Sequence, residues 1–290
     1  MKNIEPIFNT LLEHGEGPVW DEKTAQLYWV DLLRGKYFRG NLVNDTLVNY
    51  AIGQPLGALA MRQDKGLVMA LRDGFARFDE DTQQLEMVKD SPILNLPNVR
   101  FNDGSVDPKG RFLAGTMTFD GDEQIGKLYS LDEQQSYREL DDNFLIPNGM
   151  GWNKNGDQFY LIDSFQNVLF AYDYDLEAGL VSNKRVHIQF EKQEIPDGMC
   201  MDAEGSFWIA MWGGSKILNF SPKGKRIDQI EMPVPYPTSC CFGGPKLNQL
   251  FITSSQLPLN EHEKKQFPLS GRTFMVELDV VGKSDYRYNG

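Results

Sequence analysis

The sequence predicts an all-β protein folded as a six-bladed β-propeller. A tight turn followed by a strand rich in aromatic and β-branched residues recurs through the chain. Matching one apolar residue in each such strand gives spacings of 39, 45, 47, 48 and 43, measured between Tyr28, Leu67, Phe112, Phe159, Phe207 and Leu250. A period of about 40–50 residues with several strands per repeat is typical of propellers. No long stretch carries helical periodicity, which agrees with an all-β fold.

Six such units nearly fill the 290 residues. We therefore expect one propeller domain over residues 1–290, because each blade of a repeat fold packs only on its neighbours and no separate core is needed. The strands read as alternating or short apolar runs bounded by Gly, Asp and Pro. No linker or low-complexity segment interrupts them.

The chain is acidic, with 29 basic and 41 acidic side chains and a formal charge of −12. This charge disfavours nucleic acid as a partner, since no basic stripe compensates it. No apolar run is long enough for a membrane span. The three cysteines and the lack of a secretory signal favour a reducing, cytoplasmic setting. We expect a monomer or a weak dimer.

Four oxygen-bearing side chains share one register in the repeat, each five residues before the Asp or Asn that opens a tight turn. The four are Glu16, Asn102, Asn148 and Asp197, and the turn residues are Asp21, Asp107, Asn153 and Asp202. In a propeller this register faces the axis, so the four side chains should converge there. Carboxylate and amide oxygens are the ligands of hard divalent cations. A metal site in the central channel follows, with Leu59 and Cys240 on its apolar side.

Five segments carry a resemblance to a known family. They are HGEGPVW (14–20), RFNDGSVDPKGRFLAGTM (100–117), IPNGMGWN (146–153), IPDGMCMDAEGSFWIA (195–210) and TSCCFGG (238–244). In this order they resemble the regucalcin/gluconolactonase family, also called the senescence-marker-protein family. The resemblance implies a six-bladed propeller that binds one divalent metal in its channel and hydrolyses sugar lactones.

Residue by residue, the resemblance implies metal ligation by Glu16, Asn148 and Asp197 and substrate contacts by Arg100 and Asn102. A further acidic substrate-contacting position falls on Asp120, where close relatives carry Glu. On the same loop, Asp122 and Glu123 are alternatives for this role.

The residue types suit lactone hydrolysis. A divalent ion acts as a Lewis acid on a carbonyl, and Asp197 is the best candidate for the base that accepts the proton of the attacking water. Arg100 and Asn102 offer donors and an acceptor to a polyol substrate. Oxygen ligands favour Ca²⁺, Mg²⁺ or Mn²⁺, and Zn²⁺ can also occupy such sites. Two alternatives stay open: a related esterase or organophosphate hydrolase, and a calcium-binding regulatory protein without turnover.

Other residues are interpreted structurally. Residues 5–12 have no blade of their own, so we expect them to pair with residues 273–278 and close the ring. Trp29 and Trp208 are expected between blades, and Asp31 and Asp163 are expected to cap turns. His14, two residues from Glu16, fits either the site or a strand entrance.

Overall fold

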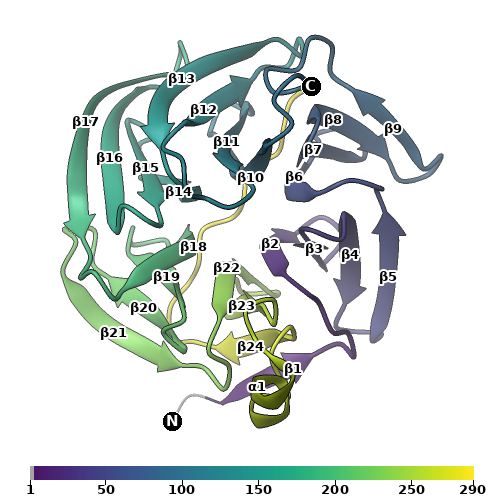
Figure 1. The fold of residues 1–290 in the computed structure, drawn as a ribbon, viewed down its shortest axis with the longest axis vertical. Coiled ribbons are helices and arrows are strands. Elements are labelled where there is room, and N and C mark those ends of the chain that lie inside the picture. Colours follow the sequence, from purple (N-terminus) through teal and green to yellow (C-terminus); the bar gives the residue numbers. More distant parts are fainter. Residues whose placement is uncertain (1–2) are drawn as a thin grey trace.

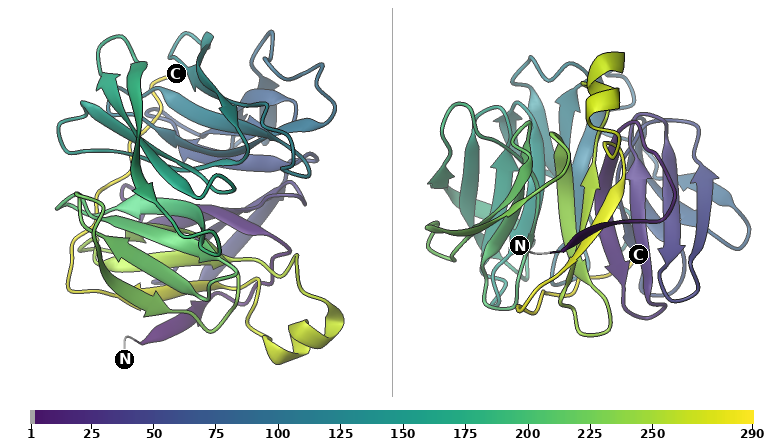
Figure 2. Two further views of the ribbon diagram at one scale, coloured as in Figure 1. Left: turned by 60° about the vertical axis from the view of Figure 1, so that its left-hand side comes forward. Right: turned by 90° about the horizontal axis from the view of Figure 1, so that it is seen from below.

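The computed structural model describes residues 3–290 as six four-stranded antiparallel sheets arranged around one axis (Figure 1). This confirms the predicted six-bladed propeller. Its one helix in the described residues, α1 (Glu261–Gln266), is capped by Asn260 and stands out from one face of the disc (Figure 2). No helix among residues 3–290 has the length and apolar character needed to cross a membrane.

Five blades are built from strands that follow one another along the chain. Blade one contains β2 (Gly15–Asp21), β3 (Gln26–Asp31), β4 (Lys36–Asn41) and β5 (Thr46–Ala51). Blade two contains β6 (Leu56–Met61), β7 (Leu67–Leu71), β8 (Gly74–Asp79) and β9 (Gln84–Met87). Blade three contains β10 (Val99–Val106), β11 (Phe112–Thr118), β12 (Gly126–Leu131) and β13 (Tyr137–Phe144).

Blades four to six complete the ring. Blade four contains β14 (Pro147–Trp152), β15 (Gln158–Asp163), β16 (Val168–Asp175) and β17 (Leu180–Gln189). Blade five contains β18 (Ile195–Met201), β19 (Phe207–Trp212), β20 (Lys216–Phe220) and β21 (Arg226–Glu231). Blade six combines β22 (Pro237–Gly243), β23 (Gln249–Ser254) and β24 (Thr273–Glu277) with the N-terminal strand β1 (Ile4–Ile7).

The ring is closed by β1, which pairs antiparallel with β24. This confirms the predicted pairing of the two ends of the chain, but the strand stops earlier than the expected residues 5–12. It ends because Phe8 adopts a positive φ of 54°, which leaves the extended conformation, and its ring stacks on Trp29 at 5.3 Å. The chain then continues to Leu12, which is fully buried.

The turn after the innermost strand is held the same way in four blades. In blade three, Asp107 accepts hydrogen bonds from the backbone N–H groups of Lys109 and Arg111 at 2.9 and 2.8 Å. Asp21, Asn153 and Asp202 make equivalent bonds in their blades. A short polar side chain that satisfies its own turn explains why Asp or Asn recurs at this position.

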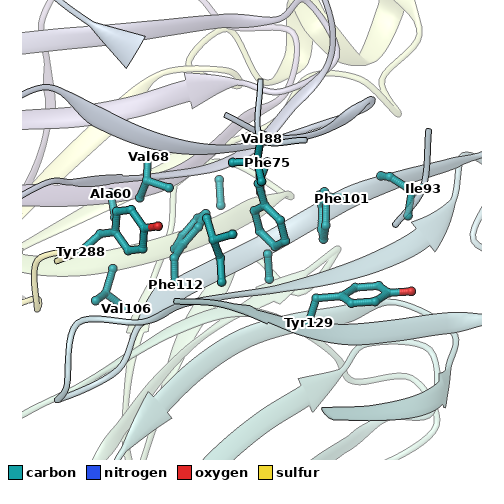
Figure 3. Close-up of a cluster of buried hydrophobic side chains, with 14 of the residues drawn as sticks. Ala60, Val68, Phe75, Val88, Ile93, Phe101, Val106, Phe112, Tyr129 and Tyr288 are labelled. Carbon is teal, nitrogen blue, oxygen red and sulfur yellow. The ribbon is translucent and has the colours of Figure 1, made fainter. Parts of the chain in front are cut away.

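Apolar side chains pack between adjacent sheets. Figure 3 shows the cluster between blades two and three, where Phe75 lies 4.5 Å from Phe101, centroid to centroid, and Tyr288 of the C-terminal tail joins from outside both blades. Trp29 lies between blades one and six, and Trp208 between blades five and six, which confirms both as inter-blade core.

The innermost strands approach one another closely around the axis. Every one of the six has a register shift near its start, as a β-bulge produces. A Cβ on Gly57 would lie only 2.6 Å from the carbonyl oxygen of Phe101 in the next blade. One on Gly149 would lie 2.8 Å from the amide nitrogen of Met199. Glycine is therefore required at these bulges because the neighbouring strand fills the space of a side chain.

Removing residues 1–12 should destabilise the whole propeller. The deletion leaves β24 as an open edge and removes the buried side chains of Ile7 and Leu12. Each such side chain contributes about 2 kcal/mol when fully buried, so we expect the melting temperature to fall by several degrees. As a control, Val43→Ser changes a side chain that is 90% exposed and should leave the melting temperature unchanged. An unchanged melting temperature in the deletion variant would contradict closure by β1.

Candidate functional site

One cavity of about 270 Å³ lies at the mouth of the channel and is lined by all six residues to which the sequence analysis assigns metal or substrate contacts. Leu59 and Cys240, expected on its apolar side, line a separate cavity instead. Glu16, Asn148 and Asp197 stand near the starts of β2, β14 and β18, and Arg100 and Asn102 lie on β10. Asp120 reaches the cavity from the loop between β11 and β12. The structure thus brings together side chains from four blades and one loop.

The bulge of each inner strand helps to place these side chains. The register shift follows Glu16 directly in blade one and Asn148 directly in blade four. In blade five it lies between Pro196 and Met199 and so includes Asp197. A bulge interrupts the regular alternation of a strand and re-aims a side chain. The repeated bulge explains why residues at one sequence register meet at the axis.

The two acidic side chains of the expected metal site lie in an electrostatically unfavourable place. Glu16 and Asp197 are only 5% and 6% exposed. Burial raises the pKa of Glu16 well above its ordinary value, and the nearby carboxylates of Asp197 and Asp103 raise it further. Burial also raises the pKa of Asp197, again with Asp103 contributing. Ionisation of these two carboxyl groups is therefore disfavoured, and a divalent cation bound between them would favour it.

Asp103 is a functional candidate that the sequence analysis did not single out. Its pKa is raised to about 6 by burial, and it accepts a hydrogen bond from the Gly104 N–H at 2.7 Å. The Asn-Asp-Gly sequence is typical of a turn, which hid its position. In the structure the bulge between Phe101 and Gly104 turns Asp103 toward the deeper part of the channel, below Glu16 and Asp197.

The amide of Asn148 joins two groups of the cavity floor. Its Nδ2 donates to Asp197 Oδ1 and to the hydroxyl of Ser164, the latter at 3.2 Å. Its Oδ1 accepts from the Gly149 N–H at 3.2 Å. Ser164 was also missed from the sequence, because its Leu-Ile-Asp-Ser segment indicated only a turn. Asp163 in that segment does cap the chain as expected, accepting from the N–H groups of residues 145 and 146.

Arg100 is the buried cation of the site. Its Nη1 donates to Asn102 Oδ1 at 2.8 Å and to the carbonyl of Phe101 at 3.1 Å. Burial lowers its pKa to about 10, so the guanidinium stays protonated at neutral pH. Its Nε is buried without a hydrogen-bond partner among residues 3–290. An unpaired buried N–H of this kind is costly.

The three acidic residues of the loop after β11 differ in position. Asp120 is exposed and lines the cavity. Asp122 and Glu123 do not line it, and Asp122 instead accepts a hydrogen bond from the hydroxyl of Thr118 at 3.3 Å. Of the three candidates, Asp120 is therefore the one placed to contact a ligand.

His14 lies in the wall of the cavity beside the floor. Its Nδ1 is 2.9 Å from the hydroxyl of Ser255, and its ring packs edge-on against Trp212 with 5.6 Å between centroids. Burial, followed by the charge of Arg100, lowers the pKa of His14 to about 3, so the ring is neutral at physiological pH. The backbone N–H of His14 is held by Asp31 at 3.1 Å, which confirms Asp31 as a cap.

The donor set fits a hard divalent cation. Among the described residues no group of three or more His, Cys, Asp or Glu side chains forms a metal site. The expected site needs none, because it consists of two carboxylates, Glu16 and Asp197, and the amide oxygen of Asn148. Two buried like charges with raised pKa values are stabilised by such an ion.

Known proteins of one family resemble this chain along most of its length. The family model described as "SMP-30/Gluconolactonase/LRE-like region" matches residues 14–256. A regucalcin of Danio rerio is 36% identical over 292 residues, covering 99% of this chain and 98% of its own. The human regucalcin is 34% identical over 284 residues, covering 95% of both chains.

Solved structures agree over the whole length. A calcium-binding protein, regucalcin, from Agrobacterium tumefaciens superimposes with a TM-score of 0.95 at 26% identity, covering 100% of this chain and 98% of its own. A luciferin-regenerating enzyme superimposes with a TM-score of 0.94 at 28% identity, covering 100% of both chains. The repeated blades, the matched region and the relatives all lead to one conclusion: the chain belongs to the SMP-30/gluconolactonase family, which includes the regucalcins.

Proposed function

We propose that this protein is a metal-dependent hydrolase that opens lactones, with sugar lactones such as a gluconolactone as the substrates that its family suggests. The observation that carries the proposal is the meeting, in one cavity, of two buried carboxyl groups with raised pKa values and a buried guanidinium. The two carboxyl groups can bind a cation, and the guanidinium can donate hydrogen bonds to an oxygen of a bound substrate.

Glu16, Asn148 and Asp197 would hold one divalent ion, Ca²⁺, Mg²⁺, Mn²⁺ or Zn²⁺. A bound ion of this kind polarises a carbonyl oxygen and stabilises the charge that develops on it. In the structure the NH₂ of the Asn148 amide faces Asp197. Because the two ends of an amide are related by a simple flip, its oxygen can take the same place.

The protein's own side chains would position the lactone and move the proton. Arg100 would donate from its guanidinium to a substrate oxygen, while Asn102, whose Nδ2 already donates to the carbonyl of Pro147 at 3.2 Å, holds Arg100 in place. Asp197 would accept the proton of the water that adds to the lactone carbonyl. The ring C–O bond then breaks, the ring oxygen takes up a proton, and a hydroxy acid is released. Asp120 would bind substrate hydroxyls at the mouth.

The test is turnover of D-glucono-1,5-lactone, followed as acid release by chelated protein that receives each of the four ions in turn. We expect at least one ion to restore hydrolysis above the spontaneous rate. Asp197→Asn should lower kcat by at least about 100-fold, the range in which a general base contributes. Asp64→Asn, which changes an exposed residue away from the cavity, is the matched control and should keep full activity.

Two results would count against this function. Turnover that survives chelation would show that no ion is needed. Tight binding of an ion without turnover of any lactone or ester would instead support the alternative of a calcium-binding protein, the activity named for the Agrobacterium relative.

Ion binding should strengthen as the pH rises. In the ion-free protein the pKa values of Asp197 and Glu16 lie above their ordinary values of 3.8 and 4.5. The folded state therefore holds protons that the unfolded state has released, so stability falls as the pH rises from about 4 through the folded pKa values. An ion binds the deprotonated carboxylates, and at 100 times its Kd it stabilises by about 2.7 kcal/mol. We expect the calcium-induced rise in melting temperature to be larger at pH 8 than at pH 5.

The same measurement on Asp197→Asn provides the control. This variant has lost one titrating carboxyl, so its chelated form should lose less stability between pH 5 and pH 8, and calcium should raise its melting temperature little. An equal calcium effect at both pH values in the unmodified protein would argue against these carboxylates as ligands.

Arg100→Lys should separate substrate binding from ion binding. Lysine keeps the positive charge but lacks the planar fork of donors. A charge-assisted hydrogen bond contributes about 1.5–3 kcal/mol, so we expect kcat/KM for the lactone to fall at least tenfold while the Kd for the ion stays within about twofold. Arg138→Lys, at an exposed position of β13, should change neither value. An Arg100→Lys enzyme with unchanged kcat/KM would remove Arg100 from the substrate site.

A further inference from the structure

The wall above the polar floor of the cavity is apolar. Phe119, Phe165 and Leu257 line the cavity and are 36%, 48% and 45% exposed. Trp212 and Leu33, both half-buried, complete this apolar rim. The floor residues, by contrast, are at most 8% exposed. Polar groups therefore lie deep in the cavity, and large apolar side chains surround its opening.

The apolar rim is assembled from separate parts of the chain. Phe119 follows β11, Phe165 follows β15, and Leu257 follows β23, while Leu33 follows β3 and Trp212 ends β19. A single exposed apolar residue on a surface is ordinary. Five that converge on one opening from five blades form a ligand-binding wall, since such pockets are mainly apolar with a few placed polar groups.

Two of the rim aromatics are held in place by their neighbours. Trp212 packs against His14 at 5.6 Å and against Tyr236 at 4.9 Å, centroid to centroid. The ring of Phe119 lies 5.9 Å from the guanidinium carbon of Arg100. The apolar rim thus begins beside the group that we place at the substrate's reacting end.

Hydroxyl groups of a ligand that lie at the level of the apolar rim would find few hydrogen-bonding groups there. Among the residues lining the cavity, Asp120 is the charged group nearest the opening, and His14 is already bonded to Ser255. A hydroxyl that loses water against Phe165 or Leu257 without a new partner is destabilised. An alkyl or aryl group at the same place is stabilised, because it is removed from water.

We propose that the site prefers lactones that carry an apolar alkyl or aryl substituent, which packs against the apolar rim while the lactone group lies on the polar floor. This inference rests on the proposed lactonase function and names its substrate class. Polyhydroxylated lactones remain substrates, but less efficient ones, since their hydroxyls face the rim.

The experiment compares δ-decalactone with δ-valerolactone in the ion-loaded protein. Both have the same six-membered ring, and only the first carries a pentyl chain. We expect kcat/KM to be at least about tenfold higher for δ-decalactone, as is usual when an apolar group enters an apolar pocket. D-glucono-1,5-lactone is measured beside them and should also be hydrolysed less efficiently than δ-decalactone.

Substitutions in the apolar rim test whether its side chains cause the preference for the lactone with an alkyl chain. Phe165→Ser and Leu257→Ser should each reduce the ratio of the two kcat/KM values at least threefold. The matched control is Ile227→Ser, which changes a side chain of 55% exposure on the outer strand β21 and should leave the ratio unchanged.

The outcomes separate the inference from the function beneath it. Hydrolysis of D-glucono-1,5-lactone with a δ-decalactone to δ-valerolactone ratio near one overturns the substrate class and leaves the lactonase in place. Hydrolysis of none of the three overturns the lactonase. In that case, calorimetry with 5-hydroxydecanoate and gluconate decides: binding at least tenfold tighter for the alkyl acid supports an apolar ligand, and equal binding overturns it.

Discussion

The close approach of six inner strands around one axis is the constraint on which the rest of this molecule depends. At Gly57 and Gly149 the next strand occupies the space where a side chain would stand, so the chain can pass only as a glycine-containing bulge. The bulge in turn changes which residues face the axis. Glu16, Asn148 and Asp197 project into the channel because each stands at or beside such a bulge. The bulges that allow the inner strands to pack closely therefore also direct the site residues into the channel.

This arrangement buries several ionisable side chains close together, which is unfavourable for the stability of the fold. Glu16, Asp103 and Asp197 are three carboxyl groups with raised pKa values, and Arg100 is the buried cation beside them. Groups in such a state destabilise the ion-free fold at neutral pH, and the inter-blade clusters of aromatic and aliphatic residues offset that cost. Functional sites commonly concentrate perturbed groups in this way, because a rigid frame can hold them where flexible segments could not.

Much of this could be predicted from sequence because the blades repeat. The spacing of one apolar residue per blade predicted the number of sheets, and the register five residues before each turn predicted Glu16, Asn102, Asn148 and Asp197. The unpredicted parts lack a repeat. Asp103 looks like a turn residue until the bulge re-aims it, and the end of β1 depends on the positive φ of Phe8, which no propensity indicates. Phe119, Phe165 and Leu257 lie on loops of unequal length, so no shared register marks their convergence.

The opposite end of the channel explains why these loops matter. There the C-terminal tail crosses the disc (Figure 1). Lys283 of this tail donates to the carbonyl of Trp152 at 2.9 Å. Lys283 and Asp285 line a separate cavity with the later residues of the inner strands, and burial raises the pKa of Asp285 to about 7. With the tail across that end, a ligand approaches the polar floor from the face that carries α1 and Leu257. A ligand that reaches the floor must then pass the apolar rim, so in the proposed lactonase the rim would select among substrates while the floor would carry out the reaction.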